Sequence, residues 1–311
     1  MNLQQLRTFV AIADTGGVAR AANTVHLSQP AASRQMQVLE ADLGVLLFDR
    51  LGRRIRLTAE GEDLLRRARR LVAEADSLRE RARALRSGHS GQIKIGATPP
   101  MIETVLASFL AKYRRRHPGI DISIIEDGGA GLIARLERGE VQLAYVPIGD
   151  ERFRGRLLYP IHVIAVLPDS HPLSRAAALE IAKLANEPLL LLHRSFASRQ
   201  WFDAACQTAN ISPNVLLESG APNAVLGLAA AGYGIGILPS MLRYPPQGVR
   251  AVPLVHRQAP IGKWTRLAWD PDRFLAPYVE TFKEELVRHA QRTYPGRDLI
   301  RRAPVLPRPA E

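Results

Sequence analysis

The chain has 311 residues, of which 46% are hydrophobic and 23% charged, so it can bury the cores of two or more domains. Its formal net charge of +12 favours a polyanionic partner, although an arginine-rich proteome would produce the same excess. The single cysteine, Cys206, excludes an intrachain disulfide and a cysteine-rich zinc site. No apolar run approaches the roughly 18 residues of a membrane span, and the N-terminus is unlike a signal peptide. We therefore expect a cytoplasmic protein with no membrane partner.

The first 44 residues have the pattern of three short helices. Apolar residues recur at helical spacing over residues 3–13, and a second, shorter helix is expected at about 18–25. A third helix begins after Ser28, which can cap it, with Pro30 in the first turn, where a missing N–H costs little. It ends at Gly44, because glycine adopts a positive φ at low cost. Three short helices with tight links are typical of a helix-turn-helix.

The two faces of the third helix differ in chemistry. One face is apolar, through Ala32, Met36, Leu39 and Leu43. The other has no carboxylate and consists of side chains that donate and accept hydrogen bonds, namely Gln29, Ser33, Arg34 and Gln37. In isolation this polar face could be an ordinary solvated surface. In the next stretch, "LLFDRLGRRIRLT" (46–58), arginines alternate with apolar residues around a glycine, which predicts a small hairpin, or wing.

A long helix is expected from Thr58 to Ser87, with acidic residues in its first turn, where they favour the positive end of the helix dipole. At 1.5 Å per residue it would be roughly 40 Å long. Leucines seven residues apart mark the expected dimerisation seam, at Leu64, Leu71, Leu78 and Leu85. Because alanines fill the second seam position, this regularity predicts pairing with the helix of a second chain. The alternative is an amphipathic helix packed only on its own domain.

After "SGHSG" (87–91) the pattern changes to short apolar runs that alternate with helical segments. Strands are expected at 92–97, 120–126, 141–146, 163–168, 188–193, 214–219, 234–239 and 265–270. Helices are expected at 101–116, 131–138, 198–209 and 222–231. This alternation predicts mainly parallel sheets in an α/β fold, as one large unit or as two lobes. The tail at 293–311 is rich in proline and arginine and is expected to lack a fixed structure.

Residues 19–61, "ARAANTVHLSQPAASRQMQVLEADLGVLLFDRLGRRIRLTAEG", resemble the LysR-type transcriptional regulators. The Ala-Ala pair, Ser-Gln-Pro-Ala, Leu-Glu, Leu-Gly, Leu-Phe-x-Arg and Leu-Thr-x-x-Gly occur together and in order. The resemblance implies a winged helix-turn-helix at 1–58, a linker and dimerisation helix at 59–89, and an effector-binding domain at 90–292. That last domain would have two α/β lobes, like periplasmic binding proteins. Lobe I would span about 90–160 and 265–292, and lobe II about 161–264.

The function that the resemblance implies is a sequence-specific DNA-binding regulator of transcription, modulated by a small-molecule effector held between the lobes. Glutamine can pair with adenine and arginine with guanine in the major groove, and wing arginines can reach the minor groove or phosphates. The expected DNA contacts are Gln29, Pro30, Ser33, Arg34, Gln37, Arg53 and Arg54. One departure is Gly17-Val18-Ala19, where many family members have Ser-x-Thr, so a hydroxyl contact to a phosphate is expected to be missing here.

Parallel sheets bind ligands beyond the carboxyl ends of their strands, which selects particular loops as effector contacts. Thr98 follows the first strand and keeps the hydroxyl that the family often has there. Phe196 could stack on an apolar ligand, and Arg194 could pair with a carboxylate, so a carboxylate is one candidate class of effector. The full set of expected effector contacts is Thr98, Pro100, Gly128, Gly129, Val146, Arg194, Ser195, Phe196 and Ser219.

The expected partners are double-stranded DNA, a small-molecule effector, RNA polymerase and further copies of the chain in a homodimer or homotetramer. The alternative is a small-molecule binding module with non-specific affinity for DNA. A third possibility, an α/β enzyme with an added dimerisation helix, lacks support because no nucleophile–base motif is present. The glycine-rich "GYGIGILP" (232–239) follows a helix and precedes a strand, the reverse of a dinucleotide-binding loop. The eight histidines have no metal-site spacing, so we expect no bound metal. Together with the absence of a catalytic motif and of a dinucleotide-binding loop, this predicts a protein that is not an enzyme and has no cofactor.

Overall fold

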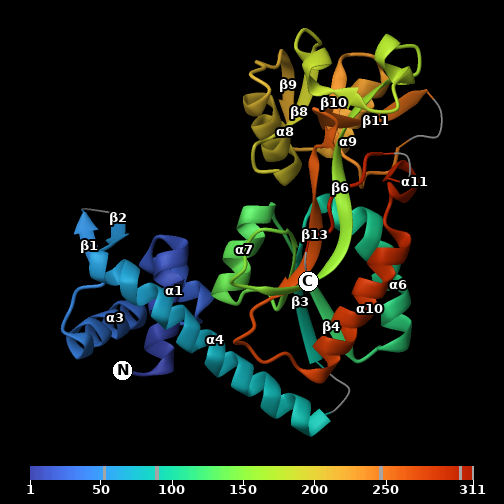
Figure 1. The fold of residues 1–311 in the computed structure, drawn as a ribbon. Helices are drawn as coiled ribbons and strands as arrows, with labels where there is room; N and C mark the ends of the chain where they lie inside the picture. The colour runs from blue at the N-terminus through green and yellow to red at the C-terminus, as the bar shows by residue number, and fades with distance from the viewer. Residues whose placement is uncertain (52–53, 88–90, 245–247, 301–302, 310–311) are drawn as a thin grey trace. The chain divides into compact units, whose positions relative to one another are not determined.

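The computed structural model describes residues 1–51, 54–87, 91–244, 248–300 and 303–309 (Figure 1). The chain divides into two compact units, Met1–Gly88 and His89–Glu311. Among the described residues, no helix combines the length and the apolar character that a membrane crossing requires.

The first unit is a winged helix-turn-helix followed by a long helix, as the sequence predicts. Its elements are α1 (Leu3–Thr15), α2 (Val18–Thr24), α3 (Gln29–Leu43), the antiparallel pair β1 (Phe48–Leu51) and β2 (Arg54–Leu57), and α4 (Ala59–Ser87). The Ser28 side chain accepts a hydrogen bond from the N–H of Ala31, and Gly44 ends α3 with a φ of 72°. The shared core contains Phe9, Ile12, Ala21, Leu39 and Leu47.

Two of the motifs that carry the family resemblance join the wing to its neighbours. The Glu40 carboxylate accepts the N–H groups of Leu47 and Phe48 at 2.8 and 3.2 Å, which anchors the start of the wing to α3. At the other end, the Thr58 hydroxyl donates to the carbonyl oxygen of Leu46 at 2.7 Å. A Cβ on Gly61 would lie 2.2 Å from the carbonyl oxygen of Leu47, so this close approach requires glycine.

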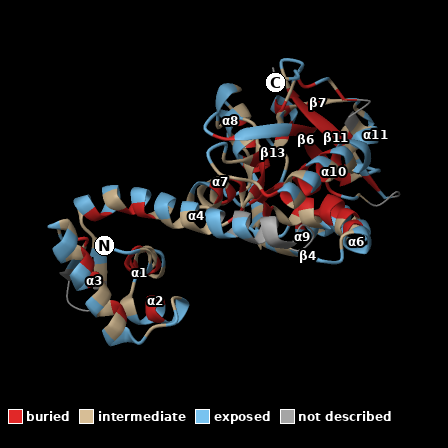
Figure 2. Ribbon diagram, turned by 90° about the horizontal axis from the view of Figure 1, so that it is seen from below, coloured by how far each residue is buried: buried red, intermediate tan, exposed pale blue. Residues whose placement is uncertain are grey.

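Helix α4 changes character along its length (Figure 2). Its first turns pack on the core of the first unit through Leu65 and Ala68, with Leu64 partly buried beside them. Further along, Leu71 and Leu78 are exposed. The side chain of Leu85 lies outside the described residues. The N-terminal part of the expected seam therefore packs on its own unit, and the exposed leucines lie beyond it.

The second unit contains two lobes that share one strand. Lobe I has the strand order β4 (Ile120–Glu126), β3 (Gly91–Ala97), β5 (Leu143–Pro147), β13 (Gly262–Trp269), β6 (Arg154–Pro168). Its helical segments are α5 (Pro99–Met101), the π-helical η1 (Ile102–Leu106), α6 (Ala107–Arg116), α7 (Gly129–Arg138) and α10 (Pro277–Thr293). Strands β3, β4 and β5 are parallel, whereas β13 and β6 run antiparallel to their neighbours.

Lobe II continues from the second half of β6 with β10 (Ile235–Pro239), β8 (Leu189–Leu192) and β9 (Val215–Ser219). Strand β11 (Val249–His256) pairs with β6 and with the short β7 (Leu179–Glu180) and β12 (Ala259–Pro260). Its helical segments are the 3-10 helices η2 (Pro172–Arg175) and η3 (Ile181–Leu184), then α8 (Ala197–Thr208) and α9 (Pro222–Ala230). The short helix α11 (Arg297–Ile300) follows α10 in the chain.

All eight expected strands and all four expected helical segments are present, most of them with shifted ends. The expectation of mainly parallel sheets is only partly right, because β6, β11 and β13 pair antiparallel. The expectation that the tail lacks a fixed structure is wrong for the described residues after 293. There the chain forms α11 and buries Ala303 and Leu306 within the second unit, because apolar residues stand among its prolines and arginines.

Candidate DNA-contacting surface and effector pocket

The outward face of α3 presents the polar side chains that the sequence selects. Gln29, Pro30, Arg34 and Gln37 are exposed and Ser33 is partly exposed, whereas Ala32, Met36 and Leu39 are buried on the opposite face. The side chains of Gln29, Ser33, Arg34 and Gln37 form no hydrogen bond or ion pair within the part of the chain that the structure describes. By contrast, Gln35 accepts a hydrogen bond from the Thr8 hydroxyl at 2.6 Å, so it serves the packing of α3 on α1.

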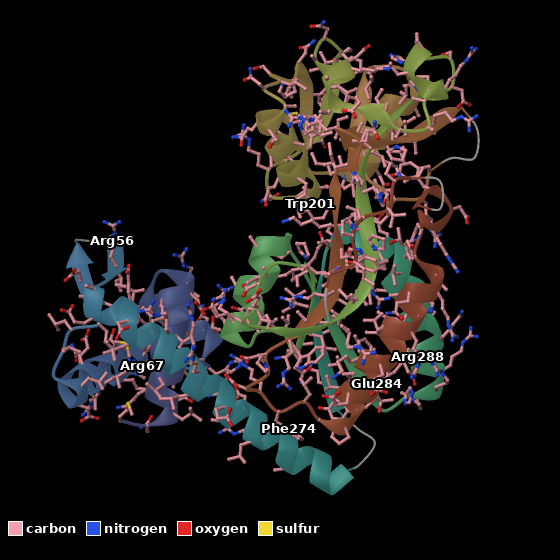
Figure 3. All side chains as sticks on the ribbon, viewed as in Figure 1. Arg56, Arg67, Trp201, Phe274, Glu284 and Arg288 are labelled. Atoms are coloured by element: carbon pink, nitrogen blue, oxygen red, sulfur yellow. The ribbon has the colours of Figure 1, made fainter. Side chains whose placement is uncertain are left out.

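The wing presents a further arginine that sequence reasoning did not select. Arg53 and the side chain of Arg54 lie outside the described residues. Arg56 on β2 is exposed and stands opposite Asp49 in the β1–β2 register (Figure 3). The alternation of Ile55 and Leu57 with arginines was the signal for it, because alternate residues of a strand share one face.

A pocket lies between the two lobes of the second unit, with about 500 Å³ of space that includes open solvent. Residues from both lobes line it: Thr98, Pro100, Gly128, Gly129, Tyr145, Pro147, Ile161, Phe196, Ala197, Ser198, Trp201, Pro239, Met241 and Thr265. None of these side chains carries a charge, and most are apolar or aromatic. The two lobes also contact each other directly, since the amide of Asn223 in lobe II donates a hydrogen bond to Glu103 in lobe I at 3.0 Å.

Five of the nine expected effector contacts line this pocket, namely Thr98, Pro100, Gly128, Gly129 and Phe196. The lobes also approach each other closely at Gly128, because a Cβ there would lie 2.9 Å from the carbonyl oxygen of Ser195. The backbone of this loop therefore lies close to lobe II and leaves little room for a side chain at position 128.

The other four expected contacts lie outside the pocket lining. Val146 is buried under α7, because it points to the opposite face of β5 from Tyr145 and Pro147. Arg194 is 81% exposed and stands 3.9 Å from Asp203. Ser195 is exposed, and the Ser219 hydroxyl accepts a hydrogen bond from the N–H of Ala221, so it serves a local turn.

Sequence reasoning missed the inward face of α8. Ser198 and Trp201 stand one turn apart on this helix, and both line the pocket. Figure 3 labels Trp201. Ser198 is 7% exposed, and its hydroxyl forms no hydrogen bond within the described part of the chain. The first turn of α8 has no side-chain cap. Its free N–H groups and the Ser198 hydroxyl are therefore available as donors to a ligand.

Helix α8 is fixed by a buried arginine that follows the pocket-lining Ser198. Arg199 is 4% exposed, and its guanidinium contacts Asp203 at 2.7 Å and Glu218 of β9 at 2.8 Å. It also donates to the carbonyl oxygen of Leu192 at the end of β8, at 2.7 Å. All three guanidinium nitrogens thus contact neighbouring parts of lobe II. Arg199 therefore positions α8 and does not face the pocket.

The lone cysteine belongs to the core of lobe II. Cys206 is buried on α8 beside Phe202, and burial raises the pKa of its thiol to about 11. Among the described residues, no group of three or more His, Cys, Asp or Glu side chains is arranged to hold a metal ion.

Two family models together match most of the chain. Residues 3–62 match the bacterial regulatory helix-turn-helix proteins of the LysR family, and residues 86–291 match the LysR substrate binding domain. The chain belongs to the LysR family. It is a DNA-binding transcriptional regulator with an N-terminal helix-turn-helix domain and a C-terminal effector-binding domain.

Relatives within the LysR family match along almost their entire length. The uncharacterized HTH-type transcriptional regulator YybE of Bacillus subtilis is 29% identical over 93% of this chain and 99% of its own. The transcriptional dual regulator GltC of the same species is 27% identical, over 93% and 97%. Among solved structures, full-length OxyR of Pseudomonas aeruginosa is 25% identical with a TM-score of 0.69, over 94% and 95%. HinK of the same species is 25% identical with a TM-score of 0.57, over 94% and 99%.

Proposed function

We propose that the outward face of α3 reads base edges in the DNA major groove. The observation that carries this proposal is the set of exposed side chains on that face, Gln29, Ser33, Arg34 and Gln37, which have no partner within the described chain. Amide and guanidinium groups pair bidentately with adenine and guanine, and Pro30 would contact a thymine methyl. Arg53, Arg54 and the exposed Arg56 of the wing would contact the minor groove or phosphates.

The test is a fluorescence-anisotropy titration with DNA from upstream of the protein's own gene, against a scrambled duplex of equal length, over a range of salt concentrations. We expect tight binding to the native fragment alone, weakening with salt in proportion to the number of phosphates contacted. Equal, salt-sensitive binding to both duplexes would refute sequence-specific recognition. It would favour the alternative of a small-molecule binding module with non-specific DNA affinity.

We propose that the pocket between the lobes holds a compact effector with an apolar or aromatic body and one hydrogen-bond acceptor. The walls formed by Phe196, Trp201 and Met241 suit such a body. The Ser198 hydroxyl and the first N–H groups of α8 would meet the acceptor. A carboxylate, the class that Arg194 suggested, would have to be held by these donors, because no charged side chain lines the pocket.

Trp201 provides a direct assay, because it is the one of the three tryptophans that lines the pocket. Matched neutral and anionic probes, benzamide and benzoate, are titrated while its fluorescence is followed. We expect quenching that the Trp201→Phe variant abolishes and the Ser198→Ala variant weakens. If neither benzamide nor benzoate changes the Trp201 fluorescence, the proposal of an aromatic effector is wrong. Quenching that Ser198→Ala leaves unaltered would remove Ser198 from the site.

We further propose that α4 pairs chains into a homodimer or homotetramer, through the exposed Leu71 and Leu78. The functional division would be 1–58 for DNA, 59–89 for pairing and 90–292 for the effector. As a regulator of transcription, the protein would work in the cytoplasm and contact RNA polymerase. A catalytic role finds no support in the pocket, since its lining has no His, Cys, Asp, Glu or Lys.

A further inference from the structure

The chain after α10 lies on the strands that join the two lobes. Strand β6 pairs with β13 in lobe I over Arg154–His162, and with β10 and β11 in lobe II over Val163–Pro168. The described residues 294–300 and 303–309, here called the C-terminal strap, contact this junction. The strap lies beyond residue 291, where the match to the LysR substrate binding domain ends.

The strap contacts both lobes. On the lobe I side, the ring of Tyr294 stacks on Tyr159 of β6, with centroids 4.6 Å apart and planes 9° apart. On the lobe II side, a Cβ on Gly296 would lie 2.1 Å from the carbonyl oxygen of Ser240, and Leu299 packs on the core cluster that contains Leu238. Figure 1 shows α11 above α10, at the height where β6 passes from one lobe to the other.

The last residues of the strap bind the junction strands themselves. The buried His162 of β6 contacts the carbonyl oxygen of Pro304 through Nε2 at 3.0 Å, and because a carbonyl only accepts, Nε2 carries the proton. The indole N–H of Trp264 on β13 donates to the carbonyl oxygen of Leu306 at 3.4 Å. Leu306 is 7% exposed, whereas its neighbour Val305 is 83% exposed, so the strap has an inward side.

The contacts that His162 and Trp264 make with the strap lie on the opposite face of β6 and β13 from the effector pocket. Neighbouring residues of a strand point to opposite faces. Ile161 lines the pocket while His162 contacts the strap, and Thr265 lines the pocket while Trp264 contacts the strap. The same short segments of β6 and β13 therefore touch the pocket on one face and the strap on the other.

We propose that the C-terminal strap connects the two lobes in addition to the strands that pass between them. By packing on β6 and β13 at the junction, it favours the arrangement of the lobes in which the pocket is closed. A change in the angle between the lobes would separate two contacts of the strap, because Tyr294 packs on Tyr159 in lobe I and Leu299 packs on the Leu238 cluster in lobe II. Docking of the strap and closure of the lobes then form one equilibrium, which either partner biases. The apparent affinity for an effector would fall with the fraction of closed molecules.

The experiment measures the separation of the lobes without an effector. Spin labels are placed on cysteines introduced at two exposed alanines, Ala130 on α7 of lobe I and Ala204 on α8 of lobe II, in a full-length Cys206→Ala chain. Labelled chains are diluted with unlabelled chains, so that distances between copies do not contribute. Double electron–electron resonance then gives the distribution of distances between lobes for the intact strap and for each strap variant.

The decisive pair is Leu306→Ser against Val305→Ser, two adjacent substitutions of similar chemistry at a buried and an exposed position. We expect Leu306→Ser and Gly296→Ala to shift the distribution to longer, broader distances, and Val305→Ser to match the intact chain. A chain ending at Thr293 should show the largest shift. If Leu306→Ser and Gly296→Ala match Val305→Ser, the strap is a passive covering and the proposal is wrong, whether or not the shortened chain folds.

Discussion

Replacing Arg199 by methionine tests how the structure positions the pocket-lining helix α8. The variant keeps the length and apolar stem of the side chain, and loses the contacts with Leu192, Asp203 and Glu218. Breaking a buried ion pair costs about 3–5 kcal/mol. Because Asp203 and Glu218 are 28% and 40% exposed, water can reach the stranded carboxylates. We therefore expect the lower end, about 3 kcal/mol of unfolding free energy.

The matched control is Arg194→Met, which removes the same charge near the same carboxylate of Asp203. Arg194 is 81% exposed, so its loss should change stability by less than about 0.5 kcal/mol. At about 2–4 °C per kcal/mol for a unit of this size, Arg199→Met should lower Tm by about 6–12 °C. Calorimetry of the two full-length variants at equal concentration measures this difference. Equal shifts for both variants would refute the assignment of Arg199 as the residue that fixes α8.

Three further outcomes follow from named contacts. Gly61→Ala should lower the unfolding free energy by about 1–3 kcal/mol, because the new Cβ would lie 2.2 Å from the Leu47 carbonyl oxygen; urea denaturation measures this, and an unchanged midpoint would contradict it. Burial lowers the pKa of His162 below its unfolded value of about 6.5. As the pH falls below about 6.5, the unfolded chain therefore takes up a proton at this histidine before the folded chain does, and the unfolding free energy decreases. His162→Gln should therefore make Tm fall less steeply between pH 7 and pH 5, and an identical slope would refute this role. Replacing Leu71 and Leu78 together by glutamate should lower the molar mass measured by light scattering, whereas an unchanged mass would exclude these leucines from the pairing surface.

Much of the first unit could be predicted because its signals are local. The cap at Ser28, the glycine at position 44 and the apolar spacing of α3 each act within one helix, so they fix the element and its buried face. The pairing seam was harder to predict, since a heptad pattern does not distinguish packing on the same unit from packing on a second chain. Leu64 lies beside the core of its own unit, whereas Leu71 is exposed.

The pocket could be predicted only as far as the loops that form it. The chain order placed Phe196 at the end of a strand, but the rotation of α8 depends on Arg199 and its carboxylate partners in the folded state. That rotation turns Ser198 and Trp201 inward, whereas Arg194, in the turn before the helix, is exposed. The tail was misjudged because composition reports the average character of a segment, whereas its packing depends on a few apolar residues such as Leu306.

The most direct test of the account is a single-base substitution scan of the bound DNA fragment with the Arg34→Ala variant. The control is Arg156→Ala, which removes one exposed positive charge from the second unit. We predict that Arg34→Ala loses discrimination at one or two base pairs, by about 1–3 kcal/mol, or about 5- to 150-fold in Kd. Arg156→Ala should keep the full pattern of base preference. Uniform weakening across all positions by Arg34→Ala would contradict the claim that α3 reads the sequence.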